Sequence, residues 1–442
     1  MSASANKESK EWTLKAGEEL RFEVAFKKTI QVRLKSGNAE YFGTELGPEA
    51  VYQFSGTNGA VFSWQGCTLV VTGECESAYV AEETPMDMFA NVHMALQQLR
   101  VQARNTDLKA APRVMIVGPD DSGKTSLARL LLSYAARMGE RPLFVSLDPL
   151  EATVSMPSTI SATLIDKPVA IESGFMGYAQ SSSHGQAETP LVLQYGYEQP
   201  EDNATLFNVL TDKLAEAVNR RLDTEKNASG IIVDTRGFSD VARNKTIEHA
   251  IASLGISTLL VVGNERMFSI YSNRLRSVTV LKLPRSGGTV DRSASFRQQQ
   301  NSRTVRQYFY GTDSQKASSF STVVNFQEIK ILRVGEDAIA PTSTLPLGED
   351  RKLTDTTVLT VEPDESLIHS ILAVTDAPLE SVQDDSMDVD GEKSVVGIQA
   401  VGFVSVTKIE MDKKRMIVLS PVPGRLPKQV LLYGNAKWME TI

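Results

Sequence analysis

The chain has 442 residues, of which 41% are hydrophobic and 23% charged, and its formal net charge at pH 7 is −8. This length exceeds what one hydrophobic core usually serves, so two or three domains are expected. No apolar run approaches the ~20 residues that span a bilayer, and the start lacks the apolar core of a secretory signal, which predicts a cytosolic or nuclear protein with no membrane partner. Cys67 and Cys75 are too few for a disulfide framework or a four-ligand zinc site, and the acidic balance argues against a general nucleic-acid coat.

The N-terminal part alternates apolar and polar side chains with a period of two, most clearly from Leu20 to Phe26, which is typical of β-strands. Gly- and Asn-containing turns separate further strand-like pieces, at Ile30 to Leu34, Ala39 to Phe42, Ala60 to Trp64 and Thr68 to Val71. The pattern predicts a small all-β domain.

A helix is expected to follow, from about Met86 to Val101. Its predicted apolar face carries Met88, Val92, Ala95, Leu96 and Leu99. We interpret it as a packing helix that joins two domains.

The next segment fits the pattern G-x-x-x-x-G-K-[ST], which forms phosphate-binding loops. It runs GPDDSGKTS over residues 118–126 and lies between an apolar strand, Val114 to Val117, and a periodic helix, Leu127 to Met138. In such a loop, glycines let backbone N–H groups meet phosphate oxygens at the start of a helix. Lys124 would reach the β- and γ-phosphates, and the Thr125 hydroxyl would bind Mg²⁺. The residues predicted to bind the nucleotide here are Gly118, Asp121, Ser122, Gly123, Lys124, Thr125 and Ser126.

From residue 114 onward, strands alternate with helices, which implies a mostly parallel sheet covered on both faces. The expected strands are Leu143 to Leu147, Gly230 to Val233, Thr258 to Val262 and Val278 to Leu283, and the expected helices lie near 125–138, 205–222 and 243–254.

Two strands of this sheet end in an aspartate. Asp148 follows the strand 143–147, where it would act as a general base toward an attacking hydroxyl or, equally, cap a turn. Asp234 ends the strand at 230–233, and a carboxylate in that place commonly holds the Mg²⁺ shell.

A basic tract follows the last strand of the sheet, with Asp291 as its one acidic residue. One interpretation is an exposed helix. The favoured one is a lid that closes over a triphosphate and supplies positive charge to the transferring phosphoryl group. Its cations are Lys282, Arg285, Arg292, Arg297, Arg303 and Arg306.

Strand-like pieces return at Thr357 to Val361, Val395 to Ile409 and Arg415 to Leu419, with a hairpin turn at 412–414, and indicate a β-rich C-terminal domain. The acidic stretch 380–392 between them is expected to be a solvated, disordered loop. The predicted fold is α/β, with a central parallel sheet of the P-loop NTPase type flanked by the two β domains. The predicted domain limits are 1–104, 105–322 and 323–442.

Together these features resemble the RNA 5′-hydroxyl kinase family that includes the cleavage/polyadenylation factor IA subunit of eukaryotes. The resemblance covers essentially the whole chain. Beside the phosphate loop and Asp148, it rests on the segments DTRG (234–237), VDRSASFR (290–297), RQYFYG (306–311) and PVPGRLP (421–427).

The resemblance implies a nuclear, three-domain protein that holds ATP and Mg²⁺ in its central domain. It implies that Lys124 binds the triphosphate, that Asp148 activates an RNA 5′-hydroxyl, and that Arg292 and Arg297 stabilise the transfer. It also assigns adenine recognition to Glu19 and Asn58.

Two further segments take an RNA-binding role from the resemblance alone. Residues 196–203, GYEQPEDN, are similar to the segment that clasps the RNA end. Phe238 stands where a tryptophan stacks on a base, and base–aromatic stacking is worth about 1–3 kcal/mol per base.

Some residues depart from the pattern of active kinases, in which the catalytic aspartate continues into Val-Gly-Gln. This chain reads DPLE over 148–151, so a proline removes a backbone donor and Glu151 adds a negative charge near an anionic substrate. Asp120 and Asp121 make the phosphate loop acidic, and Asn58 replaces a lysine of some relatives. These changes resemble the fungal branch of the family.

Two hypotheses of different classes follow. In the first, ATP is a permanently bound ligand that fixes the three domains and presents a docking surface to a scaffold subunit of cleavage factor IA, among other 3′-end processing proteins. In the second, the chain is a polynucleotide 5′-hydroxyl kinase that transfers the ATP γ-phosphate to RNA, for example in tRNA splicing.

Overall fold

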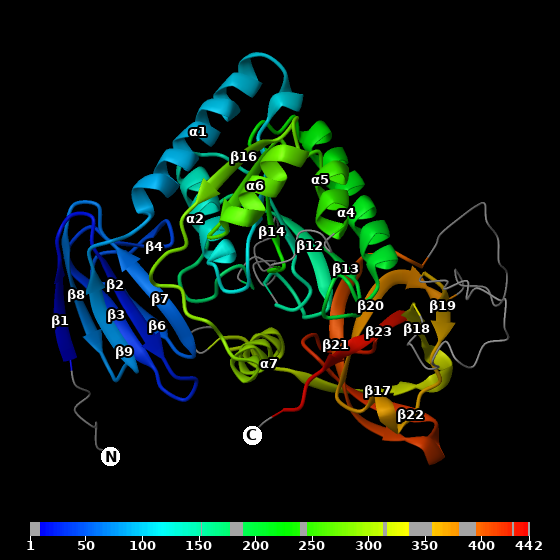
Figure 1. Cartoon of the computed structure of the whole chain (residues 1–442). Coiled ribbons are helices and arrows are strands. Elements are labelled where there is room, and N and C mark those ends of the chain that lie inside the picture. Colours follow the sequence, from blue (N-terminus) through cyan, green and yellow to red (C-terminus); the bar gives the residue numbers. More distant parts are fainter. Residues whose placement is uncertain are drawn as a thin grey trace, which may run out of the picture.

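The computed structural model describes residues 9–151, 153–176, 189–238, 245–312, 316–335, 356–379, 395–426 and 428–440. Three regions built on β-sheets follow one another along the chain (Figure 1). The architecture confirms the predicted fold class. The expected loop 380–392 lies outside the described residues.

The N-terminal region consists of two antiparallel sheets, with strand orders β1-β8-β3-β6 and β5-β4-β7-β2-β9. Alternate residues of β2 and β3, such as Leu20, Phe22, Val32 and Leu34, are buried in one shared core, as the period of two predicts. Cys67 is buried in that core, and Cys75 is half-buried at its edge. The strands are β1 (Ser9–Leu14), β2 (Glu19–Val24), β3 (Ile30–Gly37), β4 (Glu40–Tyr41), β5 (Thr44–Glu45), β6 (Val51–Phe54), β7 (Thr57–Phe62), β8 (Cys67–Thr72) and β9 (Ser77–Ala81).

Helix α1 (Met86–Asn105) joins this region to the central sheet, and its predicted buried face is correct at Val92 and Leu96 but wrong elsewhere. Met88 and Leu99 are exposed, whereas Phe89 is buried. The helix is apolar on more than one side, so periodicity alone does not select the face that packs on the central region. The buried residues are Met86, Phe89, Val92, His93, Leu96, Arg100 and Ala103.

The central sheet has the strand order β13-β12-β11-β14-β10-β15-β16. The strands β11, β14, β10, β15 and β16 are parallel. At one edge β12 pairs antiparallel with β11, and β13 pairs antiparallel with β12. This extension and helix α6 were not predicted. The elements are β10 (Arg113–Val117), α2 (Lys124–Arg137), β11 (Leu143–Leu147), β12 (Thr159–Leu164), β13 (Leu191–Gln194), α4 (Ala204–Glu225), β14 (Ile231–Thr235), α5 (Lys245–Ser253), β15 (Thr258–Val262), α6 (Glu265–Arg274) and β16 (Thr279–Leu283).

Helices cover both faces of the central sheet, as predicted. Along β10, Met115 and Val117 face the core that contains α4, α5 and α6, while Val114 and Ile116 face the core that contains α1 and α2. In the part of the chain that the structure describes, no helix is both long and apolar enough to cross a membrane.

The C-terminal region is one sheet with the order β17-β22-β21-β20-β23-β18-β19. Sequence analysis predicted β19, β21 and β22 but missed the other strands, and the predicted strand 395–409 begins at Ala400. The strands are β17 (Phe320–Asn325), β18 (Lys330–Val334), β19 (Val358–Thr360), β20 (Ser370–Pro378), β21 (Ala400–Glu410), β22 (Arg415–Ser420) and β23 (Gln429–Lys437).

Helix α7 (Ala294–Tyr310) contacts all three regions (Figure 1). Its Phe296 ring lies 4.9 Å from Phe26 of the N-terminal region. Asn301 donates to the carbonyl of Leu150 in the central region, and Phe309 stacks on Trp438 of the C-terminal region. The helix therefore holds the regions in fixed relative positions next to the phosphate loop.

Candidate functional site

The phosphate loop lies between the end of β10 and the start of α2, in the predicted order of strand, loop and helix. Gly123, directly before α2, has φ +88°, a left-handed conformation that favours glycine. A Cβ on Gly118 would lie 2.6 Å from the carbonyl oxygen of Val262. Both glycines are therefore required by the path of the backbone, which leaves the N–H groups at the start of α2 available to an anion.

Lys124 is buried in the loop, and its Nζ donates to the carbonyl oxygen of Pro119 at 2.8 Å. The Ser122 hydroxyl donates to the same carbonyl at 2.9 Å. Burial lowers the pKa of Lys124, although Asp234 and Asp148 oppose that shift. A bound phosphate oxygen would replace the carbonyl of Pro119 as the partner of the ammonium group, because a hydrogen bond between two charged groups is stronger.

Thr125 and Asp234 meet beneath the loop, where the threonine hydroxyl donates to Oδ2 of Asp234 at 2.6 Å. The other oxygen, Oδ1, is buried and has no partner among the described residues. Burial raises the pKa of Asp234 to about 6. A hydroxyl and an incompletely satisfied carboxylate fit the oxygen ligands that Mg²⁺ takes beside substrate phosphates.

Asp148 follows the end of β11 and is almost fully buried. Its Oδ1 accepts the backbone N–H of Leu150 at 3.0 Å, so the turn-capping interpretation is correct for this oxygen. Burial first, and then the charge of Glu151, raise the pKa of Asp148 to about 7. Such a value suits a proton acceptor near neutral pH, and the cap fixes its orientation.

The basic tract divides into two groups. Arg292 and Arg297 line the cavity and bind the carboxylates of Asp121 and Glu151. The other cations point elsewhere: Lys282 pairs with Glu265, Arg285 with Asp291, Arg303 with the carbonyl of Ser55, and Arg306 lies over Tyr310. Of the tract, the segment with Arg292 and Arg297 is therefore the part that reaches the cavity. A lid stays a prediction for that segment, and the charge density of the whole tract overstated it.

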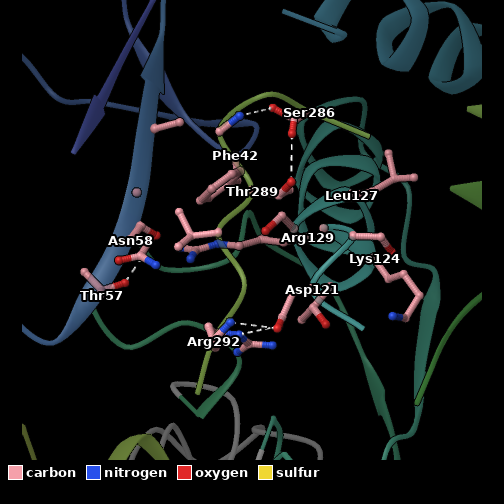
Figure 2. A pocket seen from close by; sticks show the side chains of 18 of the residues that line it. Phe42, Thr57, Asn58, Asp121, Lys124, Leu127, Arg129, Ser286, Thr289 and Arg292 are labelled. Atoms are coloured by element: carbon pink, nitrogen blue, oxygen red, sulfur yellow. Dashed lines mark hydrogen bonds and ion pairs between the residues drawn. The ribbon is translucent and has the colours of Figure 1, made fainter. Parts of the chain in front are cut away.

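These groups surround one cavity of about 330 Å³. Figure 2 shows Thr57 and Asn58 on the N-terminal strand β7 across from Lys124 and Leu127, with Arg292 paired to Asp121 at one side. The predicted residues that line the cavity are Glu19, Asn58, Asp121, Ser122, Gly123, Lys124, Thr125, Ser126, Asp148, Arg292 and Arg297. Gly118 and Asp234 lie behind this lining and support it.

Glu19 lies at the start of β2, where Arg21 donates to it at 2.5 Å. Burial raises the pKa of Glu19. The same Arg21 side chain lies against Gly288, where a Cβ would come within 2.8 Å of its Nε. Arg21 therefore lies between Glu19, the candidate for recognising the nucleotide base, and the lid segment, residues 285–297.

Sequence analysis missed the apolar end of the cavity. Side chains from β7, α1 and α2 form it, namely Phe62, Met86, Phe89, Leu127 and Leu130. They are distant in sequence and belong to three elements, so no local pattern marks them. A planar, apolar ligand group would fit against them.

The expected RNA clasp, residues 196–203, packs against the C-terminal region and does not line the cavity. Asn435 donates its backbone N–H to Gly196, and the Tyr197 hydroxyl donates to Val334. The segment reaches the site through Arg236, which lies 3.4 Å from Gln199 and pairs with Asp120 of the phosphate loop. Phe238 donates its backbone N–H to Gly118, its side chain packs against the core that contains α4, α5 and α6, and it does not line the cavity.

The fold and the loop define a nucleotide-binding protein of the P-loop class. Three family models match successive parts of the chain. Residues 13–103 match "N-terminal beta-sandwich domain of polyadenylation factor", residues 118–311 match "mRNA cleavage and polyadenylation factor CLP1 P-loop", and residues 318–440 match "Pre-mRNA cleavage complex II protein Clp1".

Curated relatives match over nearly the full length. The chain is 37% identical to the mRNA cleavage and polyadenylation factor clp1 of Botryotinia fuckeliana, over 97% of this chain and 92% of that protein. It is 36% identical to the polyribonucleotide 5′-hydroxyl-kinase Clp1 of Danio rerio, over 99% and 96%. The chain therefore belongs to the Clp1 family of mRNA cleavage and polyadenylation factors.

Solved structures share the fold. A Clp1p chain from a study of the interface between Pcf11p and Clp1p has a TM-score of 0.83 at 24% identity and covers 99% of this chain and 100% of that one. A second, from the wild-type Clp1p-Pcf11p complex, has a TM-score of 0.81 at 23% identity, over 98% and 99%.

Proposed function

We propose that this chain is an ATP-binding subunit of the pre-mRNA cleavage and polyadenylation machinery and is required for 3′-end cleavage in the nucleus. Bound ATP and Mg²⁺ hold its domains in the arrangement that a partner subunit recognises. The observation that carries this proposal is the composition of the cavity wall. Residues of β2 and β7, the phosphate loop, α1 and the lid segment all reach the same 330 Å³ space.

A ligand in that space contacts the N-terminal and central regions at once, and the lid segment continues into α7, which contacts the C-terminal region. A ligand that binds only the folded form stabilises it by RT ln(1 + [L]/Kd), about 4 kcal/mol at a thousandfold excess over Kd. The fixed domain arrangement therefore requires occupancy alone, without turnover.

We assign individual residues definite roles in holding the nucleotide. Lys124 and the N–H groups of residues 122–126 would bind the phosphates, and Thr125 and Asp234 would hold Mg²⁺, which supplies positive charge between phosphate oxygens. Glu19 and Asn58 would contact the base near the apolar end of the cavity.

The proposal that a partner subunit docks here is based on solved structures of similar proteins. Two structures that share this fold contain Clp1p with Pcf11p, so a Pcf11p-like scaffold is the partner to test. The test is the nucleotide content of the purified protein after long dialysis, by chromatography of the released nucleotide. Retained, intact ATP supports the proposal. A protein that holds no nucleotide, or only ADP, contradicts it.

A second function, RNA 5′-hydroxyl kinase, is favoured by Asp148. Its carboxylate is buried at the cavity wall with a pKa raised to about 7, chiefly by burial, and Lys124 lies in the same wall. The test is transfer of labelled γ-phosphate from ATP to a short 5′-hydroxyl RNA. Transfer that Asp148→Ala abolishes would establish the kinase. Absence of transfer from ATP-loaded protein would leave the assembly function alone.

A further inference from the structure

Four charged side chains form a closed ion-pair cluster where the lid segment meets the phosphate loop. Arg292 Nε lies 2.6 Å from Asp121 Oδ1, and its Nη2 lies 2.5 Å from Glu151 Oε1. Arg297 repeats the pattern, with Nη2 at 2.5 Å from Asp121 and Nη1 at 2.9 Å from Glu151. Each guanidinium thus binds both carboxylates, and both positive charges are already balanced.

The two carboxylates have different positions in the site. Asp121 belongs to the phosphate loop, and it also accepts the backbone N–H of Arg292 at 2.8 Å. Burial opposes its charge, but the hydrogen bonds from Arg292 prevail and lower the pKa of Asp121. Asp121 therefore anchors the lid segment to the loop.

Glu151 stands instead in the turn that Asp148 caps. Its backbone N–H lies 3.4 Å from Asp148 Oδ1, and Asn301 of α7 binds the preceding carbonyl, that of Leu150, at 2.7 Å. The Glu151 carboxylate accepts two hydrogen bonds from Arg292, a geometry that a phosphate would otherwise satisfy. Arg292 and Arg297 are thus directed to the turn next to Asp148, the candidate general base.

We propose that Glu151 is the residue that decides whether this site transfers a phosphoryl group, because its carboxylate withholds Arg292 and Arg297 from the phosphates. The inference rests on the proposed binding of ATP. Glu151 acts through the arginines and is a positioning residue that opposes transfer and permits a nucleotide to remain bound intact.

The reaction that Glu151 opposes is defined by the site. The RNA 5′-oxygen bonds to the γ-phosphorus, the bond from that phosphorus to the β–γ bridging oxygen breaks, and its electron pair leaves with ADP. The 5′-hydroxyl proton passes to Asp148. Arginines that are not paired with carboxylates can stabilise the negative charge on the transferring phosphoryl group. An arginine in that role raises the rate of transfer on the order of 10³-fold.

The experiment compares Glu151→Gln with wild type for transfer of labelled γ-phosphate to a 5′-hydroxyl RNA at saturating ATP and Mg²⁺. The amide keeps the size of the side chain and removes its charge. We expect a rise of at least ~10-fold, since part of the arginine contribution returns. Adding Asp148→Ala should abolish the gain. The matched control is Glu49→Gln, which removes a carboxylate paired with an arginine, Arg33, on the surface of the N-terminal region.

A second readout follows the lid segment without nucleotide. Trypsin cleavage after Arg292 and Arg297 in the ATP-free protein should be several-fold faster in Glu151→Gln and unchanged in Glu49→Gln. Glu151→Ala is the alternative variant if the glutamine form is unstable. Folded variants that keep wild-type transfer and wild-type cleavage rates overturn the inference, and if they also retain ATP, the assembly function stands. Wild-type protein without ATP contradicts the proposed function, while the transfer assay with added ATP still decides the role of Glu151.

Discussion

The two ends of the cavity are built from opposite kinds of side chain. At one end Phe62, Phe89 and Leu127 are buried in a core that continues into α1, α2 and the central sheet. At the other end Arg292 is held between the carboxylates of Asp121 and Glu151. Apolar packing keeps its shape whether or not a ligand is present, whereas ion pairs can be exchanged for those of an anionic ligand. The apolar end is therefore the fixed part of the cavity, and the charged end is where a bound anion would change contacts.

The largest effect is expected at the charged end, from Lys124→Ala combined with Thr125→Ala. Each charge-assisted contact that is lost costs about 1.5–3 kcal/mol, so the loss of two should lower nucleotide affinity at least ~100-fold. Nucleotide content after dialysis measures this, and a pull-down with a Pcf11p-like partner tests coupling. Unchanged capture of the partner by the ATP-free double variant would contradict the proposal that the nucleotide organises the docking surface.

At the apolar end, two neighbouring residues of α1 provide a matched pair. Phe89→Ala should lower the free energy of unfolding by about 3–5 kcal/mol, because its buried ring packs in the core beside the cavity. Met88→Ala should change it by less than about 0.5 kcal/mol, because Met88 is 44% exposed. Urea unfolding of both variants measures the difference. Equal losses would show that the assigned face of α1 is wrong.

A smaller effect of opposite sign is expected for Asp148→Asn. Burial raises the folded-state pKa of Asp148 from 3.8 to about 7, so at pH 8 the folded protein holds a buried charge that the unfolded chain hydrates. The variant should therefore be more stable than wild type at pH 8, by about 1 kcal/mol or more, and should lose this advantage progressively as the pH falls from 7 toward 3.8, the range in which only the unfolded carboxyl is ionised. Thermal unfolding of nucleotide-free protein at pH 8 and pH 5 checks the sign. A constant difference between the two pH values would rule out the shifted carboxyl.

The smallest effect is expected from deletion of residues 380–392. The stretch is acidic and poor in apolar residues, and both ends of the cavity are built from earlier parts of the chain. Nucleotide content and Tm should match wild type. Loss of folding would instead show that the stretch packs against the rest of the protein.

Local patterns were sufficient for much of the fold. The strand, loop and helix of residues 113–137 were predictable because the glycine positions and the flanking apolar residues are contiguous. β13 was missed because a four-residue apolar run carries no periodicity that distinguishes a strand, whereas β12 does alternate, with Ile160, Ala162 and Leu164 between polar residues, and that short signal was overlooked. The buried face of α1 was only partly predicted, at Val92 and Leu96, because contacts with α2 and β7, rather than periodicity, select it.

The sequence by itself determined the phosphate loop, with Lys124 at the start of the helix that follows it, and placed Asp148 and Asp234 at the ends of strands. These groups come together because neighbouring parallel strands bring their carboxyl ends to one edge. Only the tertiary structure decided that Asp121 and Glu151 would bind the lid arginines, which follow more than a hundred residues later. It alone also decided which aromatic residues would close the far end of the cavity. The reason in both cases is that long-range pairing depends on how complete elements pack, and no local pattern records that packing.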